Sequence, residues 1–171
     1  MGKSPASIRF SRLGPEHGPD LCEFYNNLSR ASLRTFRPLG TKTTIRVCRA
    51  IARDNQPDRD IKFDRVAWCS GIIVGWGFLW HLDSAEPDLG LGVADDFQGR
   101  GIGTRLVREV MAEAKRREVE RVCLIVVKEN EWAQKIYQRV GFQVRGEFVD
   151  DSDGLTYYRM SAEVGKVDAG E

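Results

Sequence analysis

The sequence predicts an α/β domain built on one mixed sheet of about seven strands, with helices on both faces. Along the chain, strand-type and helix-type segments follow the order β, α, α, β, β, β, α, β, α, β, β, and neither a change in composition nor an internal repeat marks a boundary. A single sheet covered on both sides buries the apolar face of every such element. Because 171 residues are enough for one such core, we treat residues 1–171 as a single domain.

The N-terminal part predicts a strand and two helices. "SIRFSRL" alternates as a strand does and is closed by Gly14 and Pro15. Two segments then place apolar residues at helical spacing, "DLCEFYNNLSRASLRTF" and "KTTIRVCRAIARD", and Pro38 and Gly40 separate them. These two helices are expected at about 19–54. The arginines in them are interpreted as a solvated face.

The middle of the chain predicts three strands. "KFDRVAWCSGIIVGWGFLWHL" is rich in β-branched and aromatic residues and is broken at Ser70 and Gly71, which indicates a hairpin. Trp76, Phe78 and Trp80 alternate, so they share one face and are expected in the core. "DLGLGVA" predicts a further strand.

The last third alternates helices and strands. A helix led by Ile102 repeats apolar residues every four positions, and "RVCLIVV" is apolar enough to predict a central strand covered on both faces. "EWAQKIYQRV" predicts a helix that ends at Gly141, and "FQVRGEFV" and "TYYRM" predict strands around the turn "DDSDG". The tail 163–171 is expected to fray.

The composition excludes several classes of protein. Lysine and arginine total 26 against 25 aspartate and glutamate, so no excess charge indicates nucleic acid or an anionic membrane. The four cysteines stand singly, at 22, 48, 69 and 123, which predicts reduced thiols and no metal site. No apolar run approaches the roughly 20 residues of a membrane span, and the first residues lack a signal-peptide pattern. We therefore expect a cytoplasmic protein.

The stretch "FQGRGIGTRL" places three glycines between a strand and a helix, where free backbone amides attract phosphate. A Walker loop requires a lysine after its last glycine, and Thr104 stands there instead. A dinucleotide loop requires G-x-G-x-x-G, whereas the spacing here is G-x-G-x-G.

Gln98, Gly101 and Gly103 resemble the [QR]-x-x-G-x-[GA] signature of the GNAT superfamily of N-acetyltransferases. A second segment, with Asn130, Ala133, Tyr137, Gly141 and Phe142 in order, resembles the family's N-x-x-A-x-x-x-Y-x-x-x-G-F run. The motifs occupy residues 88 to 142, and the resemblance in element order covers nearly the whole domain, with a motif-bearing core at 66–160. It implies a mostly antiparallel twisted sheet and transfer of an acetyl group from acetyl-CoA to a primary amine, directly in a ternary complex, with no metal.

The resemblance also implies roles for particular residues. The pyrophosphate of coenzyme A would lie against the loop, and backbone amides of the preceding strand would hold the developing oxyanion. Tyr137 would give a proton or hydrogen bond to the departing sulfur, and Asn130 would contact the cofactor or cap its helix. Asp88 or Glu86 would take the proton of the amine through water. We interpret His81 as a solvated loop residue. The cofactor-binding residues that it implies are Leu91, Gly92, Val93, Gln98, Gly99, Arg100, Gly101, Ile102, Gly103, Thr104, Asn130 and Tyr137.

Two other functions are compatible with these residues. The chain could be a non-catalytic sensor or scaffold that binds acetyl-CoA, which the retained Tyr137 and Asn130 disfavour, or a binder of another phosphate ligand. Within the enzyme class, the sequence leaves the acceptor open between a small amine, an aminoglycoside, a sugar amine and a protein amino group. The resemblance also implies that the N-terminal helices, at about 19–54, form the acceptor side of the site, and it allows a homodimer.

Overall fold

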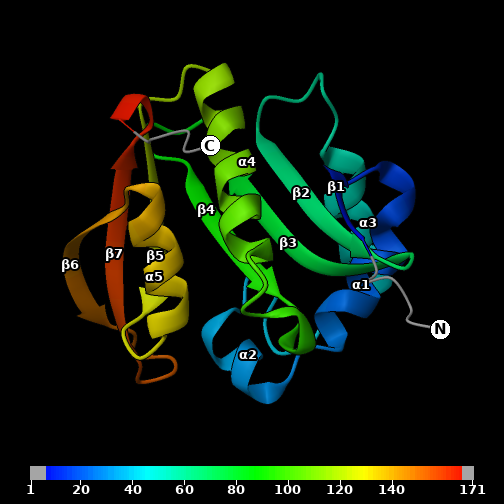
Figure 1. The fold of residues 1–171 in the computed structure, drawn as a ribbon, viewed down its shortest axis with the longest axis horizontal. Coiled ribbons are helices and arrows are strands. Elements are labelled where there is room, and N and C mark those ends of the chain that lie inside the picture. Colours follow the sequence, from blue (N-terminus) through cyan, green and yellow to red (C-terminus); the bar gives the residue numbers. More distant parts are fainter. Residues whose placement is uncertain (1–6, 167–171) are drawn as a thin grey trace.

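The computed structural model describes residues 7–166 and shows one seven-stranded sheet, with strand order β1-β2-β3-β4-β5-β7-β6 (Figure 1). All neighbouring strands are antiparallel except β4 and β5, which are parallel. The predicted mixed, mostly antiparallel sheet is therefore confirmed. The strands are β1 (Ile8–Arg12), β2 (Lys62–Cys69), β3 (Ile72–Trp80), β4 (Asp88–Val93), β5 (Arg121–Val127), β6 (Gln143–Val149) and β7 (Thr156–Glu163).

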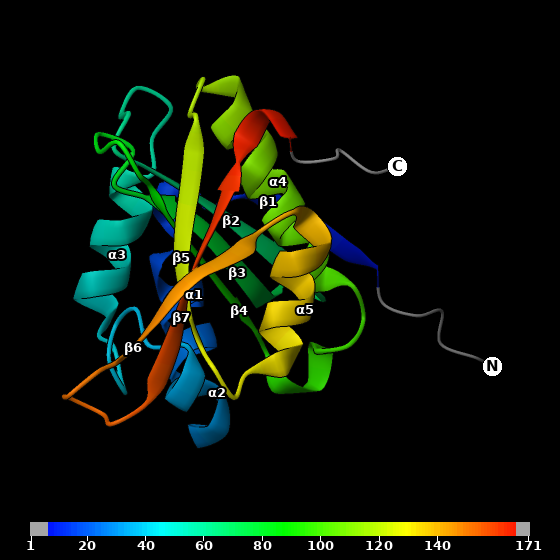
Figure 2. The same cartoon turned by 90° about the vertical axis from the view of Figure 1, so that its left-hand side faces the viewer.

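Helices cover both faces of this sheet. Figure 2 shows α4 and α5 on one face and α1 and α3 on the other, and each pair packs on its own apolar cluster. Trp76 and Phe78 lie in the cluster under α1 and α3, with Trp80 packed against it, as the alternation of β3 predicts. The helices are α1 (Gly18–Asn26), α2 (Arg30–Thr35), α3 (Ile45–Asp54), α4 (Ile102–Arg116) and α5 (Glu131–Val140).

The N-terminal part contains three helices, not the two that the sequence predicts. The chain leaves helical geometry after Asn26, and Ser29 starts a new helix because its side chain accepts a hydrogen bond from the amide of Ser32. The short helix α2 is thereby detached from α1 and lies at the end of the sheet where β4 and β5 end (Figure 1). This position brings it to the functional site described below.

Two further expectations need correction. Strand β5 is central, but only one of its faces is covered: Ile125 is 56% exposed, because none of the helices described in residues 7–166 packs on that side of β5, β7 and β6. The tail does not begin to fray at residue 163, because Glu163 ends β7 and Val164 is buried at the start of a short 3-10 helix. Residues 167–171 lie outside the described residues.

The feature that positions the site is a fork between β4 and β5. The two parallel strands are paired only at Asp88 and Cys123, where the amide of Cys123 donates to the carbonyl of Pro87 at 2.9 Å. Beyond this pair the strands part, so one side of β4 is left without a neighbouring strand. The fork opens toward the carboxyl ends of both strands, where the glycine-rich loop begins.

The cysteines are free, with Cys48 and Cys69 buried and Cys22 and Cys123 half-buried. Across residues 7–166, no group of histidine, cysteine, aspartate and glutamate is arranged to hold a metal ion. Within the same range, every helix is too short or too polar to cross a bilayer.

Glu113 on α4 gives the fold a pH-dependent contribution. Hydrogen bonds from Arg116 lower the pKa of Glu113 from 4.5 to about 2. Burial opposes this shift, and a hydrogen bond from Arg117 adds to it. Because the pKa is depressed in the folded state, the stabilisation is fully present above the unfolded-state value and is lost as pH falls from about 4.5 to 2. We expect Glu113→Gln to lower Tm by about 2–4 °C at pH 7 and to lose this difference in acid.

Thermal unfolding between pH 7 and pH 3 checks this prediction. Glu120→Gln is the matched control, because Glu120 is exposed in the loop that follows α4 and has no side-chain partner among the described residues. A Tm difference for Glu113→Gln that stays constant with pH would contradict the assignment.

Candidate active site

Helix α4 begins at the mouth of the fork without a side-chain cap. Its N-cap is Gly101, with φ +80°, and no side chain accepts from its first amides. By contrast, Ser29, Thr44 and Asn130 cap α2, α3 and α5. The first helical bond of α4 runs from the amide of Arg105 to the carbonyl of Gly101. The amides before Arg105 are therefore free to bind an anion, which the helix dipole also favours.

The three glycines of this loop are needed for different physical reasons. Gly99 and Gly101 adopt φ of +73° and +80°, and a Cβ on either would meet no atom within 4 Å. They turn the chain and leave the backbone bare, as the sequence predicts. Gly103 has another reason, because a Cβ there would lie 2.9 Å from Cδ1 of Ile136. It allows α4 to pack closely against α5.

A hollow of about 180 Å³ lies against this loop. Its lining includes two basic residues of α5, Lys135 and Arg139, which the sequence analysis missed although their i, i+4 spacing places them on one helix face. Arg100 is not among the residues that line this hollow. Its guanidinium lies 4.9 Å from the ring centre of Phe97. Ile102 is buried in the core. The lining residues are Phe97, Gln98, Gly99, Gly101, Gly103, Thr104, Trp132, Lys135, Ile136 and Arg139.

Hydrogen bonds tie the loop to α2. Gln98 Nε2 donates to the carbonyl of Val93 at 3.1 Å and lies 3.4 Å from Ser32 Oγ. Asp95 accepts from the amide and hydroxyl of Ser29 and from the hydroxyl of Ser32. Although partial burial raises the pKa of Asp95, these bonds hold it below its ordinary value. Helix α2 therefore borders the cofactor side, which the sequence analysis did not anticipate.

A second hollow, of about 270 Å³, adjoins the first and shares Gln98 and Trp132 with it. We call the two together the cleft. The second hollow follows the free side of β4 and is lined by Leu28, Ala31, Ser32, Thr35, Phe36, Leu91, Gly92, Val93, Asp95, Gln98, Glu129, Asn130 and Trp132. The structure thus brings most of the implied cofactor-binding residues to one continuous cleft.

The backbone of β4 presents donors to this cleft. The carbonyl of Pro87 points to β5, and the amide of Ala94 donates to Val74 of β3. Because groups alternate along a strand, the amides of Leu91 and Val93 point to the β5 side, where the strands have parted. These amides are placed to stabilise a negative oxygen.

Aromatic rings lie against the face of β4 that carries Gly90 and Gly92. A Cβ on Gly90 would lie 2.0 Å from the ring of Phe78, and one on Gly92 would lie 2.4 Å from the ring of Phe36. The glycines of "DLGLGV" are therefore required by the close approach of these rings.

Asn130 and Tyr137 both come from the second motif but lie in different environments. The side chain of Asn130 accepts from the amide of Ala133 and so caps α5, while the residue also lines the cleft. Tyr137 is 4% exposed in the core, edge-on to Phe142, and does not line the cleft. Burial raises the pKa of Tyr137 above its ordinary value, and among the described residues its hydroxyl has no hydrogen-bond partner.

The two acid candidates lie apart from the cleft, beside the part of the sheet over β5 and β7 that no helix of the described residues covers. Asp88 is held by Nδ1 of His81 at 2.7 Å, and Glu86 lies 3.3 Å from Nη1 of Arg121. Both line a hollow of about 660 Å³, here called the open-face hollow, which reaches the fork from the opposite end. It is lined by Glu86, Asp88, Arg121, Cys123, Leu124, Ile125, Arg145, Arg159, Met160, Ser161 and Glu163.

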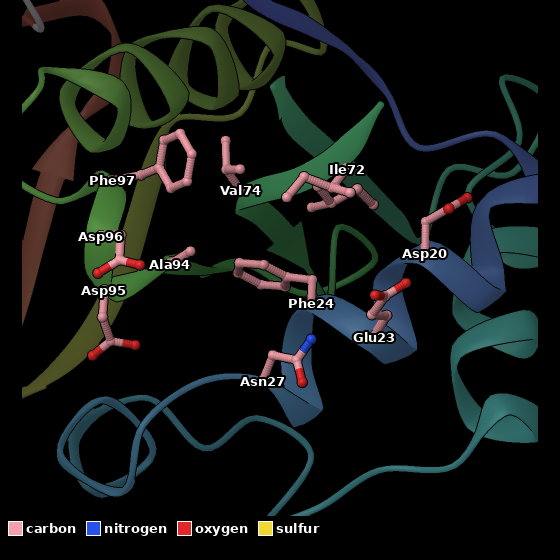
Figure 3. Close-up of a pocket in the computed structure, with 11 residues that line it drawn as sticks. Asp20, Glu23, Phe24, Asn27, Ile72, Val74, Ala94, Asp95, Asp96 and Phe97 are labelled. Carbon is pink, nitrogen blue, oxygen red and sulfur yellow. The ribbon is translucent and has the colours of Figure 1, made fainter. Parts of the chain in front are cut away.

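A fourth hollow, of about 240 Å³, lies between α1 and β3 (Figure 3). Asp95 and Asp96 stand at one end and Asp20 and Glu23 at the other, with apolar side chains such as Phe24 between them. Four carboxylates would repel a phosphate group. This hollow is therefore unsuited to a phosphate-bearing ligand, whereas the cleft, with its free amides and two basic side chains, suits one.

A fork between parallel strands, with an uncapped glycine-rich helix start at its mouth and strand amides along its side, forms a site suited to a phosphate-bearing ligand. A family model described as "Acetyltransferase (GNAT) family" matches residues 30–142. The chain belongs to this family.

Known proteins agree with this class. The chain is 38% identical over 69 residues to a 5-NmdU N-acetyltransferase of Pseudomonas phage PaMx11, covering 40% of the chain and 46% of that protein. It is 32% identical over 72 residues to a mycothiol acetyltransferase of Corynebacterium aurimucosum, covering 40% of the chain and 23% of that protein. The chain thus matches less than half the length of each curated relative.

Solved structures share the fold over nearly their whole length. An acetyltransferase of the GNAT family from Streptococcus pneumoniae has a TM-score of 0.77 at 20% identity, covering 92% of this chain and 99% of that one. The Salmonella typhimurium protein yncA, solved with its cofactor acetyl-CoA, has a TM-score of 0.78 at 17% identity, covering 96% and 98%. At these identities the likeness shows the fold.

Proposed function

We propose that the chain is an N-acetyltransferase that moves the acetyl group of acetyl-CoA directly to a primary amine, in a ternary complex. The observation that carries this proposal is the uncapped start of α4, which faces a cleft along the free side of β4. Acetyl-CoA supplies the activated acetyl thioester. In keeping with this chemistry, we expect the enzyme to act in the cytoplasm.

The cleft supplies groups for binding and for charge stabilisation. The amides of Gly99 to Thr104 would hold the pyrophosphate, with Lys135 and Arg139 adding charge from α5. The amide of Leu91 or Val93 would donate to the oxygen that becomes negative as the amine attacks the acetyl carbon. As that intermediate collapses, the carbon–sulfur bond breaks and the sulfur needs a proton.

Tyr137 is our candidate for the donor of that proton. Burial raises the pKa of Tyr137, so the phenol stays protonated and can donate a hydrogen bond to the departing sulfur, and its hydroxyl has no partner among the described residues that would compete for the hydrogen. The ring lies in the core beside the cleft, so a short movement of the sulfur or the ring must bring the two together for transfer.

Asp88 is our candidate for the proton acceptor, and Glu86 is the alternative. Asp88 shares its face of β4 with Gly90 and Gly92, which run along the fork, and it is positioned by His81. Glu86 precedes the strand and is paired with Arg121. Since the carboxylate lies several residues from the amides that hold the oxyanion, the proton passes through water.

We expect Asp88→Asn to lower kcat by about 10- to 100-fold at neutral pH and to restore part of the loss at alkaline pH, where more of the amine is already neutral. Glu86→Gln, two residues before Asp88 and outside the strand, is the matched variant. A larger loss of kcat in Glu86→Gln would transfer the role to Glu86, and equal, unchanged kcat in both would show that water alone accepts the proton.

Release of free thiol from acetyl-CoA, measured across a panel of amines, tests the proposed function itself. Thiol release that depends on an amine supports the transferase. Tight binding of acetyl-CoA with no release for any small amine or amino-terminal peptide would instead favour the non-catalytic sensor or scaffold.

A further inference from the structure

The open-face hollow contains two arginines that the reaction outlined above does not use. It is lined by three arginines, of which Arg121 is paired with Glu163 at 2.9 Å and with Glu86 at 3.3 Å. Among the described residues, no carboxylate lies within ion-pair distance of Arg145 or Arg159. These two guanidinium groups are available to an anion from outside the chain.

Both guanidinium groups are held in place before any ligand binds. Arg145 Nε donates to Ser161 Oγ at 2.9 Å, and Ser161 is only 6% exposed. The guanidinium carbon of Arg159 lies 4.1 Å from the ring centre of Phe148. Guanidinium forks anchored in this way bind carboxylate and phosphate in bidentate fashion at low entropic cost.

The strand register places these arginines beside the fork. Cys123, which is the last partner of β4, pairs with Ser161 on β7, and Ile125 pairs with Arg159 one step further along the same face. At the row of Cys123, two strand spacings put Asp88 about 10 Å from Ser161 on β7, and Arg159 lies one step further along β7. Asp88 and Arg159 thus flank β5. Between them lies Ile125, whose exposed side chain offers an apolar surface in the middle of the sheet.

We infer that the acceptor is a small amine that also carries a carboxylate or phosphate group. Arg159 and Arg145 bind the anionic group, the aliphatic part lies on Ile125, and the amine is directed past Asp88 into the fork. This assignment rests on the proposed function and specifies its substrate class. A free polyamine, which carries no anion, does not use these arginines.

Matched pairs of acceptors test the assignment. Each pair has the same amine with and without the anion: γ-aminobutyrate and its carboxamide, lysine and cadaverine, phosphoethanolamine and ethanolamine. We expect the anionic member of at least one pair to have a KM at least 10-fold lower. The carboxylate and phosphate pairs also show which anion is preferred.

Variants of the two arginines identify the cause of that preference. We expect Arg159→Gln, and more strongly the double variant with Arg145→Gln, to raise the KM for the anionic member at least 10-fold. The KM for its neutral partner and the affinity for acetyl-CoA should change less than twofold, and Arg159→Lys should retain part of the preference. Arg121 lines the same hollow but is already paired, so Arg121→Gln serves as the control.

Failure of this inference can be told apart from failure of the proposed function. Thiol release with equal KM for both members of every pair, or an equal change of both in Arg159→Gln, overturns the substrate class and leaves the transferase intact. Absence of thiol release with every amine overturns both.

Discussion

Replacement of Gly101 by leucine is expected to weaken acetyl-CoA binding at least 100-fold while the protein remains folded. The backbone at Gly101 has φ +80°, and a Cβ there would point into open space. A leucine side chain would therefore cover the free amides at the start of α4 without striking the protein. The left-handed backbone adds a strain of about 1–2 kcal/mol, which the fold can absorb.

Gly71→Leu is the matched control for this experiment. Gly71 has φ +82° and equally open surroundings, but it lies in the turn between β2 and β3, away from the cleft. Titration calorimetry with acetyl-CoA and thermal unfolding should show a similar loss of Tm in both variants and a loss of affinity only in Gly101→Leu. Equal affinity in the two variants would mean that the loop does not hold the cofactor.

Tyr137→Phe is expected to lower kcat about 10- to 100-fold, with the affinity for acetyl-CoA unchanged within twofold. The substitution removes only the hydroxyl, which has no hydrogen-bond partner among the described residues. The remaining ring keeps its edge-on packing against Phe142, so the core is preserved. A loss in kcat would then report the proton that the departing sulfur requires.

The control is Tyr158→Phe, which removes a hydroxyl from a residue packed at the edge of the same core. Steady-state thiol release and titration with acetyl-CoA give kcat and affinity for each variant. Unchanged turnover in Tyr137→Phe would remove the acid role and leave Tyr137 as a core aromatic.

Local patterns in the sequence predict most of the elements and the phosphate-binding loop. Period-2 and period-3.6 patterns depend on neighbouring residues, so the order of all the elements except the separate helix α2, and the core position of Trp76, follow from sequence alone. The same is true of the bare backbone at Gly101, because a strand-to-helix turn with glycines is a local feature. The separate helix α2 could have been found from Ser29, an N-cap residue within a helical pattern.

The fork and the uncovered sheet face could not be predicted in this way. They depend on which strands pair and where pairing stops, which is set by contacts between Asp88 and Cys123, far apart in the sequence. Without that register, nothing indicates that the acid candidates face a different hollow from the cofactor loop. The role of Gly103 is likewise non-local, because the contact that requires it is made by Ile136 on another helix.

Titration calorimetry of the wild-type protein with acetyl-CoA, coenzyme A, ATP and NAD tests the central claim most directly. The free amides at Gly101 and the cleft along β4 predict that acetyl-CoA and coenzyme A bind with one site per chain and that ATP and NAD bind far more weakly. Absence of acetyl-CoA binding, or preference for ATP or NAD, would contradict the assignment of this cleft.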